Sequence, residues 1–259
     1  MLNMNEETDL LPTEENEMYV RQRVARHDWL QKLCQKLVHV LATLAVILVL
    51  VWFNWDDEGF SWETGNKLVF NWHPVLMTVG MVCLFAESAI AYRSLASLGM
   101  QQQQKKNVHL VLHTVILLLT IVSLRAIFRF HNEATPPIKN LYSLHSWLGI
   151  LTVVLFFGQY FVGLYVYFFP RMNVETRKNV LPYHAYVGTL MFSLFVTATV
   201  VMGVLEKMTF IKACNNNGEM NNKCVVANTY GIVVIFLGGA VYLSLASPHK
   251  SLIPEPRYA

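Results

Sequence analysis

The sequence predicts an all-α fold, an integral membrane six-helix bundle whose second to fifth helices form a four-helix core. Two observations predict it. Hydrophobic residues make up 54% of the 259 residues, and Asp, Glu, Lys and Arg make up only 14%, against about a quarter in a typical globular protein. Six long apolar stretches each suit one crossing of the hydrocarbon layer, which takes about 20 helical residues. Such spans must be helical because the bilayer core offers no water to the backbone polar groups.

The apolar stretches divide the chain into a polar N-terminal tail (1–36), a transmembrane domain (37–250) and a short C-terminal tail (251–259). The expected spans cover residues 37–55, 74–93, 108–128, 142–169, 184–205 and 226–247. No apolar signal-peptide segment follows the initiator Met, so we expect the N-terminal tail to be retained.

Lysine and arginine are concentrated in the connections expected on one side of the membrane. That side holds both tails and the 94–107 and 170–183 connections, whereas the opposite side holds the acidic run at 56–58. The positive-inside rule therefore predicts that both termini are cytosolic. The connection with Cys214 and Cys224 is then non-cytosolic, where an oxidising compartment would favour a disulfide between them.

The N-terminal tail contains a candidate sorting signal. Residues 6–11 read E-E-T-D-L-L, which resembles an acidic dileucine motif for endosomes and lysosomes. This pattern favours the late endosome or lysosome over the plasma membrane or a secretory vesicle. An ordinary disordered tail explains the same residues.

Four histidines are the strongest functional signal. His73, His109, His145 and His184 follow one another at intervals of 36, 36 and 39 residues, each about one helix plus a connection. Successive crossings place His73 and His145 near the outer face, and His109 and His184 near the inner face. Neutral imidazole is a common metal ligand, and two facing imidazoles provide the axial ligands of a low-spin b-type haem. The pattern predicts two haem b groups and electron transfer across the membrane.

Other interpretations of these histidines remain open at this point. Histidines also cap helices or lie at the membrane interface, although matched depths for all four argue against that. His113 lies four residues after His109 on the same helical face, so spacing allows either one to be the ligand. A membrane metal-ion transporter would use histidines along one midplane pathway. A haem-free membrane scaffold would use them structurally.

Four segments carry a family resemblance: F-N-W-H-P at 70–74, K-N-V-H at 106–109, Y-S-L-H-S-W at 142–147 and P-Y-H at 182–184. Together they resemble the cytochrome b561 family, ascorbate-dependent transmembrane oxidoreductases with six helices and two haems b, over residues 37–250. The resemblance implies haem ligation by His73 with His145 and by His109 with His184. His113 would then pack beside a haem or bind a propionate.

The resemblance also implies a cytosolic ascorbate site. Ascorbate is an anion, so its site needs positive charge near the inner histidines. Lys106 lies one turn before His109 and Arg177 about two turns before His184. Both match basic residues that the family uses, with Lys105 and Arg93 as assisting candidates. The positive-inside rule alone would also explain these charges.

On the opposite side, the resemblance implies Fe³⁺ or monodehydroascorbate as the electron acceptor. His131 matches a family position near that site, and Arg125 and Arg129 approach the same end of the third span. The arginines would bind haem propionates, a semidehydroascorbate anion or a chelated ferric ion. Snorkelling to the interface explains Arg129 nearly as well.

The expected activity is an ascorbate-dependent ferric or monodehydroascorbate reductase. No residue is expected to act as a general acid, a general base or a nucleophile. The expected partners are ascorbate, the acceptor, the lipid bilayer and, by the resemblance, a second copy in a homodimer. No basic-aromatic module indicates nucleic acid.

Three polar residues outside the pattern of four histidines are expected to have structural roles. His39 and Glu87 lie within the first and second expected spans, where an ionisable side chain needs a polar partner. Glu206, at the end of the fifth span, is expected to form a surface pair with Lys207 or to position a connection.

Overall fold

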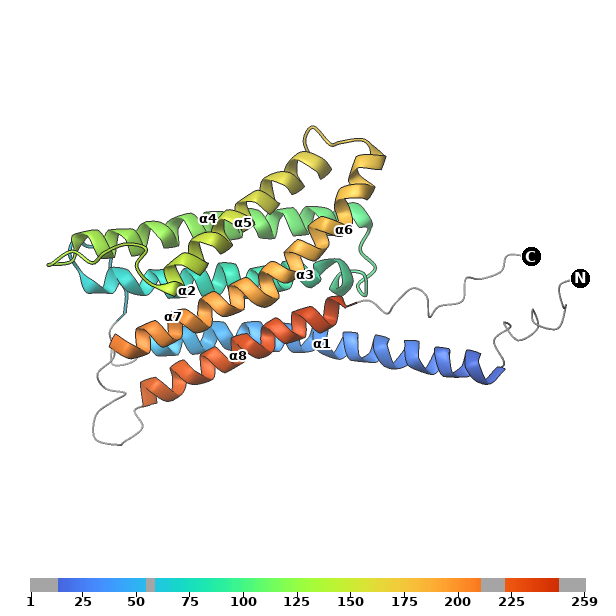
Figure 1. Cartoon of the computed structure of the whole chain (residues 1–259), viewed down its shortest axis with the longest axis horizontal. Helices are drawn as coiled ribbons and strands as arrows, with labels where there is room; N and C mark the ends of the chain where they lie inside the picture. The colour runs from blue at the N-terminus through green and yellow to red at the C-terminus, as the bar shows by residue number, and fades with distance from the viewer. Residues whose placement is uncertain (1–13, 55–58, 211–221, 247–259) are drawn as a thin grey trace, which may run out of the picture.

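The computed structural model describes residues 14–54, 59–210 and 222–246, and its side chains are described for 28–54, 59–208 and 222–246. Figure 1 shows the arrangement of its helices. They are α1 (Glu14–Asn54), η3 (Lys67–Asn71), α2 (Trp72–Met77), η4 (Thr78–Leu84), α3 (Phe85–Ser94), α4 (Gln102–Glu133), α5 (Leu144–Tyr167), α6 (Val174–Leu190), η5 (Met191–Val196), α7 (Thr197–Phe210) and α8 (Asn222–Leu245).

Six helical segments of the described chain are long and apolar enough to cross a membrane. This confirms the predicted six-helix membrane bundle. The second span runs from Lys67 to Leu98 through η3, α2, η4 and α3, and the fifth runs from Val174 to Met208 through α6, η5 and α7. We call the end of the bundle that carries the α3–α4 connection and the end of α8 the inner end, and the opposite end the outer end.

The helices extend beyond the apolar stretches because polar residues add turns at their ends. The third span was expected at 108–128, but α4 begins at Gln102. Gln101 and Gln104 form a capping box there, in which each side chain accepts the other residue's backbone N–H. The glutamine-rich stretch expected in a connection therefore forms the first turns of α4.

The first and last spans pack against each other on one side of the other helices, as α1 and α8 in Figure 1 show. Val38, Ala42, Ala45 and Val49 lie fully buried along one face of α1. Such small side chains let membrane helices approach closely. The second to fifth spans therefore form a group of four helices, with α1 and α8 as an added layer.

Two spans contain a π-helical segment, which the sequence did not indicate. These are η4 in the second span and η5 in the fifth. A π-helical turn inserts a residue and shifts the face that the following helix presents. Phe85 after η4 and Phe192 within η5 meet in the middle of the bundle, with ring centroids 5.3 Å apart.

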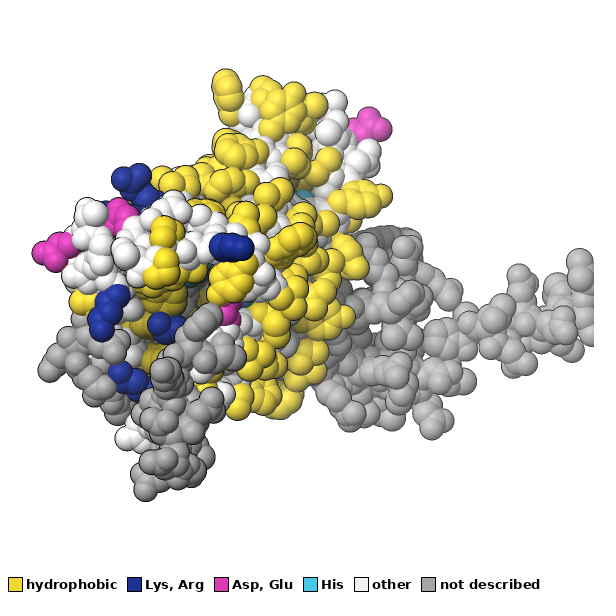
Figure 2. Space-filling view, turned by 60° about the vertical axis from the view of Figure 1, so that its left-hand side comes forward, with side chains coloured by type: hydrophobic (Ala, Val, Ile, Leu, Met, Phe, Trp, Pro, Cys, Tyr) yellow, Lys and Arg dark blue, Asp and Glu magenta, His cyan; other side chains and the backbone are white. Residues whose placement is uncertain are grey.

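The outer surface suits a lipid environment. Figure 2 shows hydrophobic side chains over the middle of the molecule, with most of the visible Lys and Arg near one end. Large side chains such as Phe236 and Val154 are more than half exposed. Within the membrane, His39 of α1 and Glu87 of α3 pair with a 2.7 Å Nδ1–Oε2 distance. Each of these two ionisable residues thus has a polar partner.

We predict that Gly238→Ala destabilises the bundle. A Cβ atom there would lie 2.5 Å from Thr197 Oγ1 and 3.3 Å from the Ser193 carbonyl oxygen, so the Thr197 side chain or the backbone of α8 would have to shift. Overpacking of this kind costs about 1–3 kcal/mol. Thermal unfolding in detergent measures it. The control is Gly239→Ala, whose Cβ atom would meet no described atom within 4 Å apart from those of its own helix turn; equal melting temperatures for the two variants would contradict the prediction.

Candidate functional site

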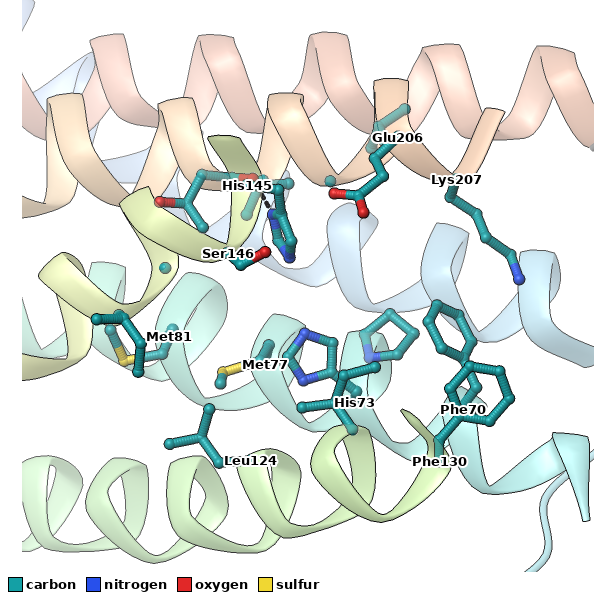
Figure 3. A pocket seen from close by; sticks show the side chains of 18 of the residues that line it. Phe70, His73, Met77, Met81, Leu124, Phe130, His145, Ser146, Glu206 and Lys207 are labelled. Carbon is teal, nitrogen blue, oxygen red and sulfur yellow. Dashed lines mark hydrogen bonds between the residues drawn. The ribbon is translucent and has the colours of Figure 1, made fainter. Parts of the chain in front are cut away.

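The first site lies at the outer end, where His73 of α2 faces His145 of α5. Their ring centroids are 6.2 Å apart and the ring planes are nearly perpendicular, at 83°. Figure 3 shows the two rings on opposite sides of one cavity. Ser143 begins α5 as its N-cap, so His145 lies in the first turn of this helix.

Hydrogen bonds determine which nitrogen of each outer imidazole carries the proton. His145 Nδ1 lies 2.8 Å from the Thr199 carbonyl oxygen, which can only accept, so Nδ1 carries the proton. Ser123 Oγ donates to the His73 carbonyl oxygen at 3.2 Å and lies 3.0 Å from His73 Nδ1. The hydroxyl has one proton, so it accepts from Nδ1. Both Nε2 atoms therefore keep a lone pair, as a metal ligand requires.

The second site lies at the inner end, where His109 of α4 faces His184 of α6. Their ring centroids are 6.3 Å apart, almost the outer value. His109 Nδ1 lies 3.0 Å from the Ser88 carbonyl oxygen, which assigns the proton to Nδ1 here too. His184 Nδ1 is buried and has no hydrogen-bond partner among the described residues.

Both pairs have the separation of two imidazoles that share one metal ion. Imidazole nitrogen binds a metal at about 2 Å, so the two ring centres then lie about 6 Å apart. The tautomers assigned above also suit ligation through Nε2. The chemistry and spacing of these four residues therefore fit two bis-histidine haem sites.

His113 lies beside the inner pair and not between its members. Its ring packs 4.4 Å from His109, 5.4 Å from Phe85 and 5.5 Å from Phe156, measured between centroids. These contacts are those of a packing residue. They support His109 as the partner of His184.

The outer pair borders a cavity of about 530 Å³, called the outer cavity below. Its size falls within the range of about 300–1,000 Å³ usual for small-molecule and cofactor sites. Most of its lining is apolar, and His131, Asn140, Glu206 and Lys207 are among the polar lining residues. Trp52 of α1 and Tyr230 of α8 also line it. The added layer of two helices therefore completes a site that was expected within the four-helix core.

The three residues expected to contact the electron acceptor have different surroundings in the structure. His131 lines the outer cavity, and its Nδ1 lies 3.1 Å from Asn140 Oδ1. Arg129 instead donates to Glu133, to the Trp62 carbonyl oxygen and to Thr64 Oγ1, at 2.7–2.8 Å. Arg125 is exposed on α4 and is not a lining residue of the cavity. Arg129 therefore anchors the 59–66 connection, and His131 alone of the three candidates borders the cavity.

Sequence reasoning missed Glu206 and Lys207 as cavity residues. Both project from the end of α7 beside the outer cavity in Figure 3. Lys207 Nζ lies 4.1 Å from the Phe70 ring centroid, a cation–π distance. Glu206 accepts from the Tyr142 hydroxyl at 3.0 Å. Burial raises the pKa of Tyr142, and the hydrogen bond to Glu206 and its charge raise that pKa further. The available signal was their depth, because they lie 22 and 23 residues after the inner His184.

Basic side chains gather beside the inner pair. Lys106 Nζ lies 6.0 Å from the Tyr167 ring, which lies 5.9 Å from the His184 ring, both measured to centroids. Arg171 and Arg177 lie close enough for their charges to act on Lys106. Arg177 Nε is buried without a hydrogen-bond partner in the described part of the chain. Lys106, Arg171 and Arg177, called the inner basic cluster below, suit an anion; Arg171 was not among the expected contacts.

Two other basic residues, Arg93 and Lys105, are candidates for contact with ascorbate. Arg93 donates to the Ser244 and Leu245 carbonyl oxygens at 2.7 and 3.0 Å, and so caps the end of α8. Lys105 is half-buried in the first turns of α4, next to Lys106.

Some expectations concern residues outside the described ranges, namely Cys214, the acidic run at 56–58 and the motif at 6–11. The Cys214–Cys224 disulfide and the sorting signal therefore stay predictions.

We predict that Arg129→Met loosens the 59–66 connection, because it removes the donors to Trp62 and Thr64. Amide hydrogen exchange of residues 59–66, followed by mass spectrometry, should become faster. Arg125→Met is the matched control, four residues earlier on α4, and should leave exchange there unchanged. Slow exchange in the Arg129 variant would show that this arginine does not hold the connection.

The chain matches one protein family and is similar to several known proteins. Residues 72–211 match the family described as eukaryotic cytochrome b561. A lysosomal membrane ascorbate-dependent ferrireductase of Bos taurus is 38% identical over 219 residues, covering 83% of this chain and 80% of its own. A transmembrane ascorbate ferrireductase of Arabidopsis thaliana is 38% identical over 212 residues, covering 81% and 85%. An ascorbate-specific transmembrane electron transporter of Zea mays is 36% identical over 220 residues, covering 85% and 90%. The family match and these relatives show that the chain belongs to the cytochrome b561 family.

Proposed function

We propose that this protein transfers electrons across a membrane from cytosolic ascorbate to Fe³⁺ or monodehydroascorbate on the other side. The observation that carries the proposal is the presence of two facing imidazole pairs at opposite ends of the bundle, with nearly equal ring separations of 6.2 and 6.3 Å. Relatives named as ascorbate-dependent ferrireductases and electron transporters support it.

Membership of the cytochrome b561 family implies haem b. In this proposal the chain holds two haems, one between His73 and His145 and one between His109 and His184. A bis-histidine haem supplies single-electron transfer without an open coordination position. Ser123, Thr199 and Ser88 orient three of the four imidazoles through Nδ1.

The inner basic cluster is the proposed ascorbate site. Its cations attract an anion, and Tyr167 connects them to the inner pair. The Tyr167 hydroxyl donates to the Arg177 carbonyl oxygen at 3.3 Å, and its ring lies against His184. Lys105 adds positive charge beside Lys106. Because Arg93 already caps α8, we leave it out of the contact set.

In this proposal the haem occupies the part of the outer cavity between His73 and His145, and the acceptor approaches through the part that His131 and Lys207 line. Both termini are then cytosolic, as the positive-inside rule predicts. The lysosomal names of relatives in Bos taurus and Mus musculus support a lysosomal or late endosomal membrane. A homodimer stays an expectation from the family resemblance.

The middle of the bundle argues against a transporter for metal ions. Phe85, Phe156 and Phe192 lie between the two histidine levels, each at most 2% exposed. Phe85 packs 5.6 Å from Phe156 and 5.3 Å from Phe192, between ring centroids. An ion pathway would need a continuous row of polar groups at this depth, whereas His113 there packs against Phe85 and Phe156. The aromatic packing excludes ions and water from the space between the two sites.

The haem assignment predicts that purified protein binds two b-type haems per chain and that His145→Ala loses one of them. A dithionite-reduced minus oxidised absorbance spectrum with a pyridine haemochrome assay measures the count. His113→Leu is the control and should keep both haems. Loss of a haem in the His113 variant would overturn the choice of His109 as ligand, and wild-type protein without haem would overturn the function.

The ascorbate assignment predicts that Lys106→Ala and Arg177→Ala slow haem reduction by ascorbate by about tenfold or more, because they remove the attracting charge. Stopped-flow absorbance measures the rate, and high salt should shrink the difference. Dithionite should still reduce each variant completely. Lys178→Ala, an exposed cation next to Arg177, is the control; equal rates in all four proteins would remove the inner basic cluster from the mechanism.

A further inference from the structure

One face of α7 meets the first turn of α5 at three points. Thr199, Gly203 and Glu206 are separated by four and three residues, which places them on one side of a helix. The Thr199 carbonyl oxygen accepts from His145 Nδ1 at 2.8 Å. A Cβ atom at Gly203 would lie 2.8 Å from His145 Cε1 and 2.9 Å from Nδ1. The absence of a side chain at Gly203 therefore lets the imidazole lie against α7.

Glu206 makes the third contact, and it reaches the helix start directly. Its Oε2 accepts from the Ser143 hydroxyl at 2.7 Å, and its Oε1 accepts from the Tyr142 hydroxyl at 3.0 Å. Ser143 is the N-cap of α5 and accepts the Ser146 N–H at 3.2 Å. A hydroxyl has one proton, so its donation to Glu206 leaves lone pairs free for the helix. The carboxylate thus fixes the orientation of the cap.

We infer that Glu206 is a positioning residue for His145, which it holds through Ser143 and Tyr142; the inference rests on the proposed haem ligation. His145 lies two residues after the cap, so a shift of the helix start moves its imidazole relative to His73. Glu206 accepts hydrogen bonds with both carboxylate oxygens, whereas a glutamine side chain offers only one acceptor oxygen. The inner ligand His184 lies within α6, 22 residues before Glu206, and supplies an internal reference.

The test compares Glu206→Gln and Glu206→Ala with wild type and with Glu175→Gln, an exposed carboxylate at the start of α6. Low-temperature electron paramagnetic resonance resolves low-spin ferric haems, and the outer signal is the one missing in His145→Ala. We expect the outer signal and the outer midpoint potential to shift in the glutamine variant. In the alanine variant, affinity for the outer haem should fall about tenfold or more. The inner signal should stay at its wild-type position throughout.

Ser143→Ala supplies an independent check. It removes the same link from the other side, so the Ser143→Ala, Glu206→Gln double variant should shift the outer signal less than the sum of the single variants. Additive shifts would contradict the inference. If Glu206→Ala does not accumulate, the similarly shaped glutamine variant carries the comparison.

The outcomes separate this inference from the proposed function. Wild-type protein that lacks two bis-histidine signals overturns the haem assignment itself. Two wild-type signals, with an outer signal unchanged in both Glu206 variants, leave that assignment intact and overturn the role of Glu206.

Discussion

The hydrogen bonds at histidine Nδ1 are the interactions on which the candidate site depends. Imidazole has two nitrogens, and a facing pair can share a metal only if each ring presents an unprotonated nitrogen to the centre. In three of the four rings, the proton on Nδ1 is bound by an oxygen atom of another residue. The oxygen belongs to Ser88 for His109, to Ser123 for His73 and to Thr199 for His145. Each acceptor comes from a helix other than the one that carries the histidine. The packing of neighbouring helices therefore determines which nitrogen of each of these three imidazoles carries the proton.

The π-helical segments explain how each of two spans supplies groups to both histidine sites. The second span carries His73 before η4 and Ser88 after it, and the fifth carries His184 before η5 and Thr199 after it. Each of these spans thus supplies a histidine to one site and an oxygen acceptor to the other. A regular helix fixes the angle between two such positions, and an added residue changes that angle. The π-helical turns therefore adjust the two sites separately within one continuous span.

The sequence was sufficient for the number of spans and for the two histidine pairs, because both follow from distances along a helix. Spacing gives the depth of a residue in the membrane and its face on its own helix. It does not give the partner on a neighbouring helix. Arg129 and Arg93 looked like ligand contacts by depth, yet they hold a connection and cap α8. For Glu206 the sequence left open a surface pair with Lys207 or a role in positioning a connection, and its contact with Ser143 at the start of α5 agrees with the second.

The two ends of the bundle differ in charge, and this difference bears on the direction of electron flow. At the inner end, the inner basic cluster of Lys106, Arg171 and Arg177 brings three positive charges together, which favours an anion. At the outer end, the cavity combines Glu206, Lys207 and His131. A carboxylate beside a cation weakens the attraction for anions and tolerates a metal cation. Among the described residues, an anionic donor is thus attracted more strongly to the inner basic cluster than to the outer cavity, which admits an acceptor of either sign. This asymmetry favours electron entry at the inner end.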